Sequence, residues 1–385
     1  MPGHDKGERS RAGHVLFSVN SSWNVINFRA GLVRALLAEG YAVTVAAPRD
    51  EHSPAVEQLG CRYVELPMDA QGRSPVADLQ LLARFVRLMR AERFDALLSF
   101  TPKPNIYGSI AARLCGVPAI NNIPGLGLVF NERGPTSRIL RAMYRPALRR
   151  SAHIFFQNEH DRALFERERL VDPAKTELLP GSGVDVSRFQ PVPAAADPVP
   201  FVFLLVARLL WEKGIAELIE AGRLVRAQHP AIEIRILGFV EDGNPKFVRT
   251  DDLRQWQREG LATYLGPTSD VRPHLAEADC VVLPSYYPEG TPRALLEAAA
   301  SGKPIITCDL PGCRNVVDNG ENGFLVPPRD AGALADRMLA MIRLGADRRA
   351  AMGRHSRQIA ETRFDEQLVI DRYTAALRRV VGKSR

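Results

Sequence analysis

Two carboxylates, Glu289 and Glu297, stand eight residues apart in the stretch EGTPRALLE, and their spacing and surroundings could serve to hold a sugar. The stretch follows an apolar run, DCVVLP, that predicts a buried strand. A helix is expected to start near Pro292, because proline is favoured at the first helical position. Glu289 then lies in the loop and Glu297 inside the helix. An ionised carboxylate only accepts hydrogen bonds, and it can take two from a vicinal diol such as a ribose.

The same two residues also have a purely structural interpretation. Glu289 would cap the helix or offset its dipole, and Glu297 would lie on a solvated face. The flanking ALL and AAA segments instead favour a mostly buried helix, where a carboxylate needs a partner because burying an unpaired charge costs several kcal/mol. Backbone N–H groups of Thr291, Arg293 and Ala294 would face an anion such as a diphosphate at the start of this helix. We therefore favour the binding role.

A second cluster, Arg208 and Lys213 in VARLLWEKG, follows the strand expected at FVFLLVAR. A guanidinium fork and a flexible ammonium at one strand end could clamp a diphosphate and neutralise it as it leaves. Taken alone, such residues are more often a surface pair. Their position at the carboxyl end of a strand, where parallel sheets bind ligands, favours the clamp.

The elements that must position these residues follow an α/β rhythm. From His14 onward, β-branched runs alternate with helical patterns, which is typical of βα units around a parallel sheet. A Pro- and Ala-rich stretch without periodicity, 188–200, is the best linker, and the rhythm restarts after it. In parallel sheets the ligand sits beyond the carboxyl ends of the strands, so two facing sheets predict a cleft between domains.

Composition narrows the class of protein. The 385 residues suit two domains of about 190 residues, and no segment reaches the roughly 18 consecutive apolar residues that a membrane span needs. The polar opening, 1–13, is expected to be a disordered tail without an export signal, so we expect a cytoplasmic protein. A net charge of +7 favours anionic partners, and no nucleic-acid-binding motif is found. Five scattered cysteines suit reduced core thiols, and we expect no metal at Cys308 and Cys313.

Three segments of the first half are further candidates. Lys103 and Asn105 follow the strand expected at DALLSF and could meet an acceptor or a phosphate, although TPKPN is equally a proline-stiffened turn. The pair Gly125 and Gly127 favours a tight turn over a phosphate loop. Residues 133–150 hold six arginines and no acid.

Apolar residues recur at helical spacing within 133–150, and Pro146 is expected to kink the helix. The structural interpretation is a helix that packs on its own domain with a solvated basic edge. The functional interpretation is docking on anionic lipid or on a lipid diphosphate, at about 1 kcal/mol per basic side chain. The arginines beside the apolar stripe are Arg138, Arg141, Arg145 and Arg149.

Four of these elements, in this order, resemble the family-4 retaining glycosyltransferases of GT-B fold. They are TPKPNIYGSIAARLCGVPAINNIPGLGLVF, the GSGVD…RF of Gly181 to Phe189, the Arg208 and Lys213 segment, and the glutamate pair. The first resembles the branch that builds capsular, O-antigen and lipid-linked oligosaccharides. The fold that the resemblance implies is a pair of Rossmann-like α/β domains facing across a cleft. Its parts would be an acceptor-side domain over 14–187, a nucleotide-sugar-binding domain over 201–363, and a helix over 364–385 that returns to the N-terminal domain.

The resemblance also implies roles for the candidate residues. It implies sugar transfer from a nucleotide diphosphate with retention of anomeric configuration and without an essential metal or other cofactor. The departing phosphate would itself take the acceptor proton on the front face, so the protein's task would be to stabilise the leaving group. Arg208, Lys213 and Glu289 would be catalytic, with Glu289 on the donor sugar. The donor-binding residues would be Glu297 on the ribose, with Gly290, Thr291 and Arg293.

One loop departs from the family pattern. The usual glycine pair after the first strand is replaced by NSSW, residues 20–23, so the hydroxyls of Ser21 and Ser22 would have to donate to the phosphate instead. The expected function is transfer of an N-acetylhexosamine from its UDP form to a lipid-linked saccharide at the cytoplasmic face of the membrane. Two rivals are a nucleotide-sugar 2-epimerase and a non-catalytic nucleotide-binding partner of a transferase.

Overall fold

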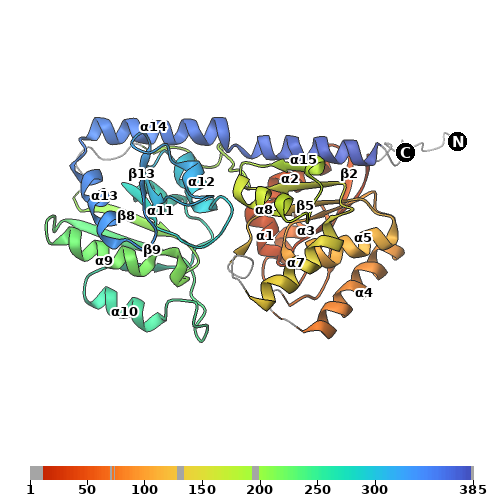
Figure 1. Ribbon diagram of the computed structural model, residues 1–385. Helices are drawn as coiled ribbons and strands as arrows, with labels where there is room; N and C mark the ends of the chain where they lie inside the picture. Colours follow the sequence, from red (N-terminus) through yellow and green to blue (C-terminus); the bar gives the residue numbers. More distant parts are fainter. Residues whose placement is uncertain (1–11, 70–71, 73, 128–133, 193–198, 383–385) are drawn as a thin grey trace. The chain divides into compact units, whose positions relative to one another are not determined.

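The computed structural model describes residues 12–69, 72, 74–127, 134–192 and 199–382 (Figure 1). The chain divides into two compact units. The N-terminal unit reaches to Ser182 and takes in the chain from Gln367 onward, and the C-terminal unit is Gly183–Glu366. The stretch 188–200 therefore falls within the C-terminal unit, because Phe189 is buried in that unit's core. Part of it, 193–198, and most of the expected tail, 1–11, lie outside the described residues.

The N-terminal unit is built on a parallel sheet of seven strands in the order β3-β2-β1-β4-β5-β6-β7. Its central strands are apolar runs, as the sequence predicts. The sequence does not indicate β3 and β7, because edge strands are half exposed and lack a continuous apolar run. The strands are β1 (Gly13–Ser18), β2 (Tyr41–Ala47), β3 (Arg62–Glu65), β4 (Ala96–Ser99), β5 (Ala119–Ile123), β6 (His153–Phe156) and β7 (Thr176–Leu178).

Helices cover both faces of this sheet, and each face has its own apolar core. One core packs α1 (Ser22–Phe28), α2 (Ala30–Ala38), α3 (Ser53–Glu57) and α15 (Glu366–Val381) on the sheet. The other packs α4 (Pro75–Ala91), α5 (Ser109–Cys115), α7 (Pro135–Leu148) and α8 (Glu159–Arg167), together with the π-helical turn η1 (Pro104–Gly108). A short 3-10 turn, η2 (Pro173–Lys175), precedes β7.

The C-terminal unit has a second parallel sheet, in the order β10-β9-β8-β11-β12-β13. One core packs α9, α10 and α13 on it, and another packs α11, α12 and α14. The strands are β8 (Phe201–Val206), β9 (Ile232–Leu237), β10 (Thr263–Gly266), β11 (Cys280–Leu283), β12 (Ile305–Cys308) and β13 (Gly323–Val326). The helices are η3 (Trp211–Lys213), α9 (Ile215–Arg226), α10 (Thr250–Arg258), α11 (Arg272–Glu277), α12 (Arg293–Ala300), η4 (Arg314–Val316), α13 (Ala331–Arg343) and α14 (Ala346–Arg363).

Each unit is thus a doubly wound, Rossmann-like α/β domain, which confirms the predicted fold class. Along the part of the chain that the structure describes, no helix has both the length and the hydropathy that a bilayer span requires.

Candidate active site

The predicted donor residues gather where the C-terminal sheet reverses its winding. Strand order runs outward in both directions from β8 and β11, which pair directly through Val281 and Leu204. Such a switch point opens a crevice beyond the carboxyl ends of the two strands. Arg208 and Lys213 follow β8, and Glu289 follows β11. The backbone topology therefore brings together residues that lie 76 positions apart, such as Lys213 and Glu289.

Two glycines let the loops of this site approach one another closely. Gly214 ends η3 in the left-handed conformation with φ of 77°, and a Cβ placed there would meet the carbonyl oxygen of Pro284 at 2.2 Å. Gly312, with φ of 74°, would bring a Cβ within 2.3 Å of the carbonyl oxygen of Gly290. A side chain at Gly214 would push the β8 and β11 loops apart, and one at Gly312 would push apart the loops after β11 and β12.

Lys213 and Glu289 form an ion pair at the centre of the site. The ammonium Nζ of Lys213 donates to Oε1 of Glu289, and Ser285 Oγ donates to the same oxygen at 3.1 Å. Lys213 is only 6% exposed and Ser285 is fully buried. Nζ of Lys213 also lies 5.3 Å from the centroid of the Tyr287 ring. One carboxylate oxygen of Glu289 is thus fixed by protein, while no contact within the described residues engages Oε2.

Arg208 lies at the rim of this cluster with its side chain exposed. Its guanidinium hydrogen-bonds to the hydroxyl of Tyr287. Burial raises the pKa of Tyr287, and the nearby charge of Arg208 opposes that rise. The hydroxyl therefore stays protonated at neutral pH, and it orients an arginine whose remaining N–H donors are available to a ligand.

The start of α12 presents unpaired polar groups beside the ion pair. The helix begins at Arg293, with Pro292 at the N-cap position, one residue later than predicted. Within the described residues, the backbone N–H groups of Gly290, Thr291 and Ala294 donate to no protein acceptor. The side chain of Thr291 has a buried hydroxyl that lacks a hydrogen-bond partner. These donors match an anion, and the helix dipole adds to them.

Glu297 lies one turn further along α12 and is paired with Arg293. Nε of Arg293 donates to Oε1 of Glu297 at 3.0 Å, and Nη1 of Arg293 donates to the carbonyl of Gly183 at 2.6 Å. Burial raises the pKa of Glu297, and the charge of Arg293 opposes the rise. The structure thus supplies the partner that a buried carboxylate at this position was expected to need.

Cysteines near the site are inert. Cys313 lies close to the charges of Glu289 and Lys213, and burial raises its pKa to about 12. Burial likewise raises the pKa of Cys308 to about 12. Both thiols are therefore protonated at neutral pH, and a protonated thiol is a poor metal ligand. The described residues contain no cluster of three histidine, cysteine or acidic side chains that could hold a metal ion.

The two serines predicted to bind phosphate in the N-terminal unit form hydrogen bonds with other residues of the protein. Ser21 Oγ accepts from the N–H of Asn24 at 3.3 Å and so caps α1. Ser22 is fully buried, and its Oγ lies 2.9 Å from Ser53 Oγ. The N–H of Ser22 donates to Oδ2 of Asp50 at 2.7 Å. The carboxylate of Asp50 and the cap of α1 therefore engage these groups within the protein, and the donor role expected for both serines stays a prediction.

Lys103 and Asn105 lie in different surroundings, one at the surface and the other in the core. Lys103 Nζ donates to Oδ1 of Asp78 at 2.6 Å at the edge of a surface pocket. Asn105 is fully buried, where its Oδ1 accepts from Ser99 Oγ at 2.6 Å and its Nδ2 donates to the carbonyl of Asn122 at 2.7 Å. Asn105 is therefore a structural residue of the core, contrary to the ligand role expected for it.

The basic segment forms the helix α7, whose apolar face packs on the N-terminal unit. Tyr144, Ala147 and Leu148 are buried there, so this face does not enter a membrane. The helix continues through Pro146, which the sequence had predicted as a kink. Arg141 forms an ion pair with Glu168. The outer face carries Arg138, Arg145 and Arg149, with Ile139 61% exposed.

Sequence reasoning missed several residues that complete these sites. Ser285 and Tyr287 lie within the loop that carries Glu289, and the tyrosine pair SYYP was the available signal for them. Asp50 and Asp78 contact predicted residues from 28 and 25 positions away, and no local pattern marks them. Gly125 and Gly127 lie in the loop after β5, and the residues that follow them, 128–133, lie outside the described residues.

Comparison with known proteins places both halves of the chain among glycosyltransferase domains. Residues 200–343 match the family model described as "Glycosyl transferases group 1", and residues 27–181 match the "Glycosyl transferase 4-like domain". A relative from Campylobacter jejuni, named N,N'-diacetylbacillosaminyl-diphospho-undecaprenol alpha-1,3-N-acetylgalactosaminyltransferase, is 25% identical over 95% of this chain and 98% of its own length. A relative from Escherichia coli, named UDP-Gal:alpha-D-GlcNAc-diphosphoundecaprenol alpha-1,3-galactosyltransferase, is 27% identical over 77% of this chain and 79% of its own length.

Solved structures match the fold over nearly the whole chain. HepE from Anabaena, determined with UDP and glucose, superposes with a TM-score of 0.78 over 95% of this chain and 99% of its own, at 20% identity. Sucrose-phosphate synthase from Thermosynechococcus elongatus gives 0.78 over 96% of this chain and 100% of its own, also at 20% identity. These likenesses show the GT-B fold, and the two family models show that each half of the chain is a glycosyltransferase domain.

Proposed function

We propose that this chain, which belongs to the glycosyltransferases of GT-B fold, moves a sugar from a UDP-sugar onto a saccharide linked to a polyprenyl diphosphate. The sugar that we propose is an N-acetylhexosamine, transferred with retention of anomeric configuration and without an essential metal. The product would serve the assembly of a surface polysaccharide or a lipid-linked glycan. The acceptor class is supported by the two relatives named above, both of which act on a sugar diphospho-undecaprenol.

One observation carries the donor half of this proposal. Arg208 and Lys213 converge with the free N–H groups at the start of α12, at the switch point of the C-terminal sheet. Two cationic side chains and a helix N-terminus form a site for a diphosphate. Glu289, whose Oε2 is not engaged by the described residues, is placed to accept from a hydroxyl of the donor sugar, and Glu297 from the ribose.

The chemistry then rests on the leaving group. As the bond between the anomeric carbon and the phosphate oxygen breaks, negative charge grows on the diphosphate, and Lys213 and Arg208 stabilise it. The acceptor oxygen forms the new bond to the anomeric carbon on the same face of the sugar, and the departing phosphate oxygen takes the proton of that acceptor hydroxyl. Since the leaving phosphate takes the proton, Glu289 acts neither as an acid nor as a base in this route. Its ion pair with Lys213 fixes both groups before the substrate binds.

Membrane association belongs to the same proposal. A polyprenyl-linked acceptor lies in a bilayer, and the outer face of α7 offers Arg138, Arg145 and Arg149 to anionic headgroups. Each exposed arginine near such a surface contributes about 1 kcal/mol. We propose that the protein acts as a peripheral protein at the cytoplasmic face of the membrane.

A donor panel tests the proposal. Purified protein is incubated with UDP- and GDP-sugars, with and without a polyprenyl-diphosphate-linked sugar, and nucleotide release is measured with and without EDTA. We expect acceptor-dependent UDP release from a UDP-N-acetylhexosamine that EDTA does not reduce, and an axial anomeric linkage by NMR when the donor is the α anomer. Conversion of UDP-N-acetylglucosamine to an epimer without acceptor would instead establish the 2-epimerase. No turnover with any donor, and unchanged cellular function of Glu289→Ala, would favour the non-catalytic partner.

A further inference from the structure

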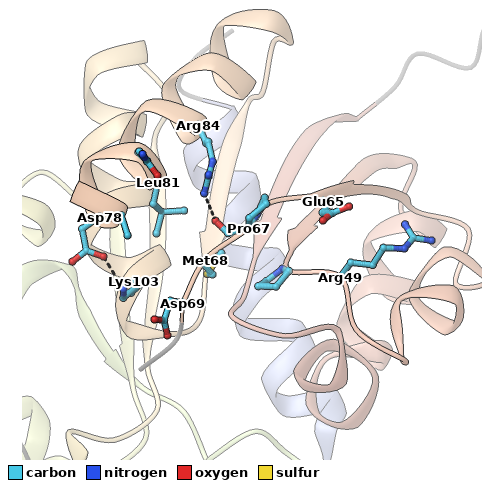
Figure 2. A pocket seen from close by; sticks show the side chains of 12 residues that line it. Arg49, Glu65, Pro67, Met68, Asp69, Asp78, Leu81, Arg84 and Lys103 are labelled. Atoms are coloured by element: carbon cyan, nitrogen blue, oxygen red, sulfur yellow. Dashed lines mark hydrogen bonds and ion pairs between the residues drawn. The ribbon is translucent and has the colours of Figure 1, made fainter. Parts of the chain in front are cut away.

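A surface pocket of about 460 Å³ lies in the N-terminal unit, beyond the carboxyl ends of β2 and β3 (Figure 2). Arg49 follows β2, Asp69 lies in the loop after β3, and Lys103 comes from the loop after β4. The first turns of α4 close one side with Asp78 and Arg84. Its volume lies within the roughly 300–1,000 Å³ that small-ligand sites span, and its place at strand carboxyl ends is where α/β sheets bind ligands.

Contacts within the protein hold the walls of this pocket in position. Asp78 accepts from Lys103 Nζ at 2.6 Å and from the hydroxyl of Tyr107 at 2.7 Å, so both of its carboxylate oxygens are fixed. Nη1 of Arg84 donates to the carbonyl of Pro67 at 2.7 Å. Figure 2 shows the contact of Lys103 with Asp78 and that of Arg84 with Pro67. A ligand would therefore meet groups that are already oriented.

The lining offers both donors and acceptors to a ligand. Arg84 has five N–H donors and uses one to bond the carbonyl of Pro67, and Lys103 has three and uses one to bond Asp78. Glu65 adds a carboxylate acceptor, Asp69 has a carboxylate that already accepts from the N–H of Gly72 at 2.7 Å, and Met68 adds an apolar surface. Sugar hydroxyls both donate and accept, and the C–H face of a sugar ring is apolar. This mixture of groups suits a saccharide.

The charge of the lining argues against a diphosphate. Among the described residues that line the pocket, three cationic side chains, Arg49, Arg84 and Lys103, are balanced by three carboxylates. A diphosphate would gain no net attraction there and would lie beside carboxylates that repel it. None of the described residues that line the pocket is aromatic, so these residues offer no stacking surface of the kind that a nucleobase favours. The carboxylates are Glu65, Asp69 and Asp78.

We propose that this pocket binds a sugar residue of the acceptor saccharide, through Arg84, Lys103 and the carboxylates around them. The inference rests on the proposed function and names the part of the acceptor that the N-terminal unit recognises. The donor and the diphosphate of the acceptor bind elsewhere. Residues of the pocket thus set the affinity for the acceptor and leave the donor site unchanged.

The test uses Arg84→Ala in the full-length protein, with Arg87→Ala as the matched control. Arg87 is an exposed arginine on the same helix that does not line the pocket. We expect Arg84→Ala to raise the KM for the lipid-linked acceptor about tenfold, because the pocket loses charged hydrogen bonds to the sugar. Donor KM and the slow release of UDP without acceptor should equal those of wild type. Equal acceptor KM for Arg84→Ala, Arg87→Ala and wild type would overturn the inference.

A second variant guards against a folding effect of Arg84, whose side chain also contacts Pro67. Gln80→Trp leaves every contact named above intact and places a ring in the pocket, since the exposed Gln80 lines it. It should likewise raise the acceptor KM. Inhibition by polyprenyl diphosphate without sugar is measured in parallel. If Arg84→Ala weakened that inhibition as much as it weakened acceptor binding, the pocket would bind the diphosphate and the inference would be wrong.

The outcomes also separate this inference from the proposed function. A wild-type protein that transfers sugar while both pocket variants behave as wild type would leave the proposed function standing and remove only the pocket's role. A wild-type protein that transfers no sugar to any lipid-linked acceptor would contradict the proposed function itself, and with it the inference.

Discussion

In both units the strand order reverses at a central pair of strands, β1 and β4 in the N-terminal unit and β8 and β11 in the C-terminal unit. The loops at these two switch points are nevertheless filled differently. In the C-terminal unit the loops present Arg208, Lys213 and the free N–H groups of α12. In the N-terminal unit the N–H of Ser22 already donates to Asp50. The topology thus gives each sheet a switch point where an anion could bind. The residue types in the loops determine at which switch point the N–H donors remain available to a ligand.

This difference supports the proposal that the nucleotide diphosphate binds to the C-terminal unit. An internal carboxylate both neutralises the start of α1 and repels a phosphate, so the N-terminal switch point needs no ligand. At the C-terminal switch point, Arg208 and Lys213 lie around Glu289, and no described carboxylate accepts from the N–H groups of Gly290, Thr291 and Ala294. In the proposal, the acceptor and the membrane are then contacted by the N-terminal unit.

The largest expected effect is a loss of kcat when the cation of the ion pair at the C-terminal switch point is removed. Lys213→Ala should lower kcat about 100- to 1,000-fold, because the leaving diphosphate loses a buried cation. Steady-state UDP release measures it, and Lys246→Ala, which removes an exposed lysine of the same unit, is the control. A kcat within threefold of wild type would mean that the diphosphate leaves elsewhere.

The next effect concerns the N-terminal unit and the membrane. Replacing Arg138, Arg145 and Arg149 by alanine should lower partition onto anionic vesicles roughly 100-fold, since each arginine contributes about 1 kcal/mol. Co-sedimentation with vesicles of phosphatidylglycerol and phosphatidylcholine measures the change. Donor turnover in solution should not change.

The matched control for this variant removes the same charge from the C-terminal unit. It replaces exposed arginines of α10 and α14, namely Arg254, Arg258 and Arg354. If both triple variants lost partition equally, net charge rather than the face of α7 would determine membrane binding.

The third effect is a loss of stability when Asp50 is removed from the N-terminal switch point. Asp50→Ala leaves the N–H groups of Ser22 and Trp23 without their acceptor, which should cost about 1 kcal/mol and lower the melting temperature by about 2–4 °C. Calorimetry measures the shift, with Glu51→Ala as control because the Glu51 side chain is 88% exposed. Added phosphate should restore part of the stability of the Asp50 variant only. A variant as stable as wild type would show that Asp50 does not hold this loop.

A smaller effect probes how Arg208 is oriented. Tyr287→Phe removes the hydroxyl that contacts the guanidinium and should lower kcat about threefold while donor KM stays constant. Arg208→Ala should be much more severe, and the double variant should equal Arg208→Ala. Additive losses in the double variant would show that Tyr287 acts independently of Arg208.

The smallest effect is a pH dependence at α12. Burial raises the pKa of Glu297, so its folded form binds a proton more tightly than its unfolded form. Its contribution to stability is present below the ordinary glutamate pKa and is lost as pH rises through the raised value. The difference in melting temperature between wild type and Glu297→Gln should therefore fall across that window. Glu321→Gln, at an exposed position, should show no such trend.

The sequence predicted what local pattern encodes. Apolar runs marked the central strands, and the loop after β11 was found because strand, loop and helix follow each other within residues 280–300. The edge strands β3, β7 and β10 escaped because half-exposed strands carry no such run. The closure of the α1 loop by Asp50 and the burial of Asn105 depend on contacts across the sheet, which no spacing in the sequence reveals.

Hydrogen exchange of the full-length protein with and without a UDP-sugar that it uses tests the central claim most directly. If the C-terminal switch point holds the donor, peptides over 207–214 and 285–300 should gain protection on binding, and the peptide over 19–24 should exchange as in the free protein. Protection over 19–24 without protection over 285–300 would contradict the assignment of the donor to the C-terminal unit.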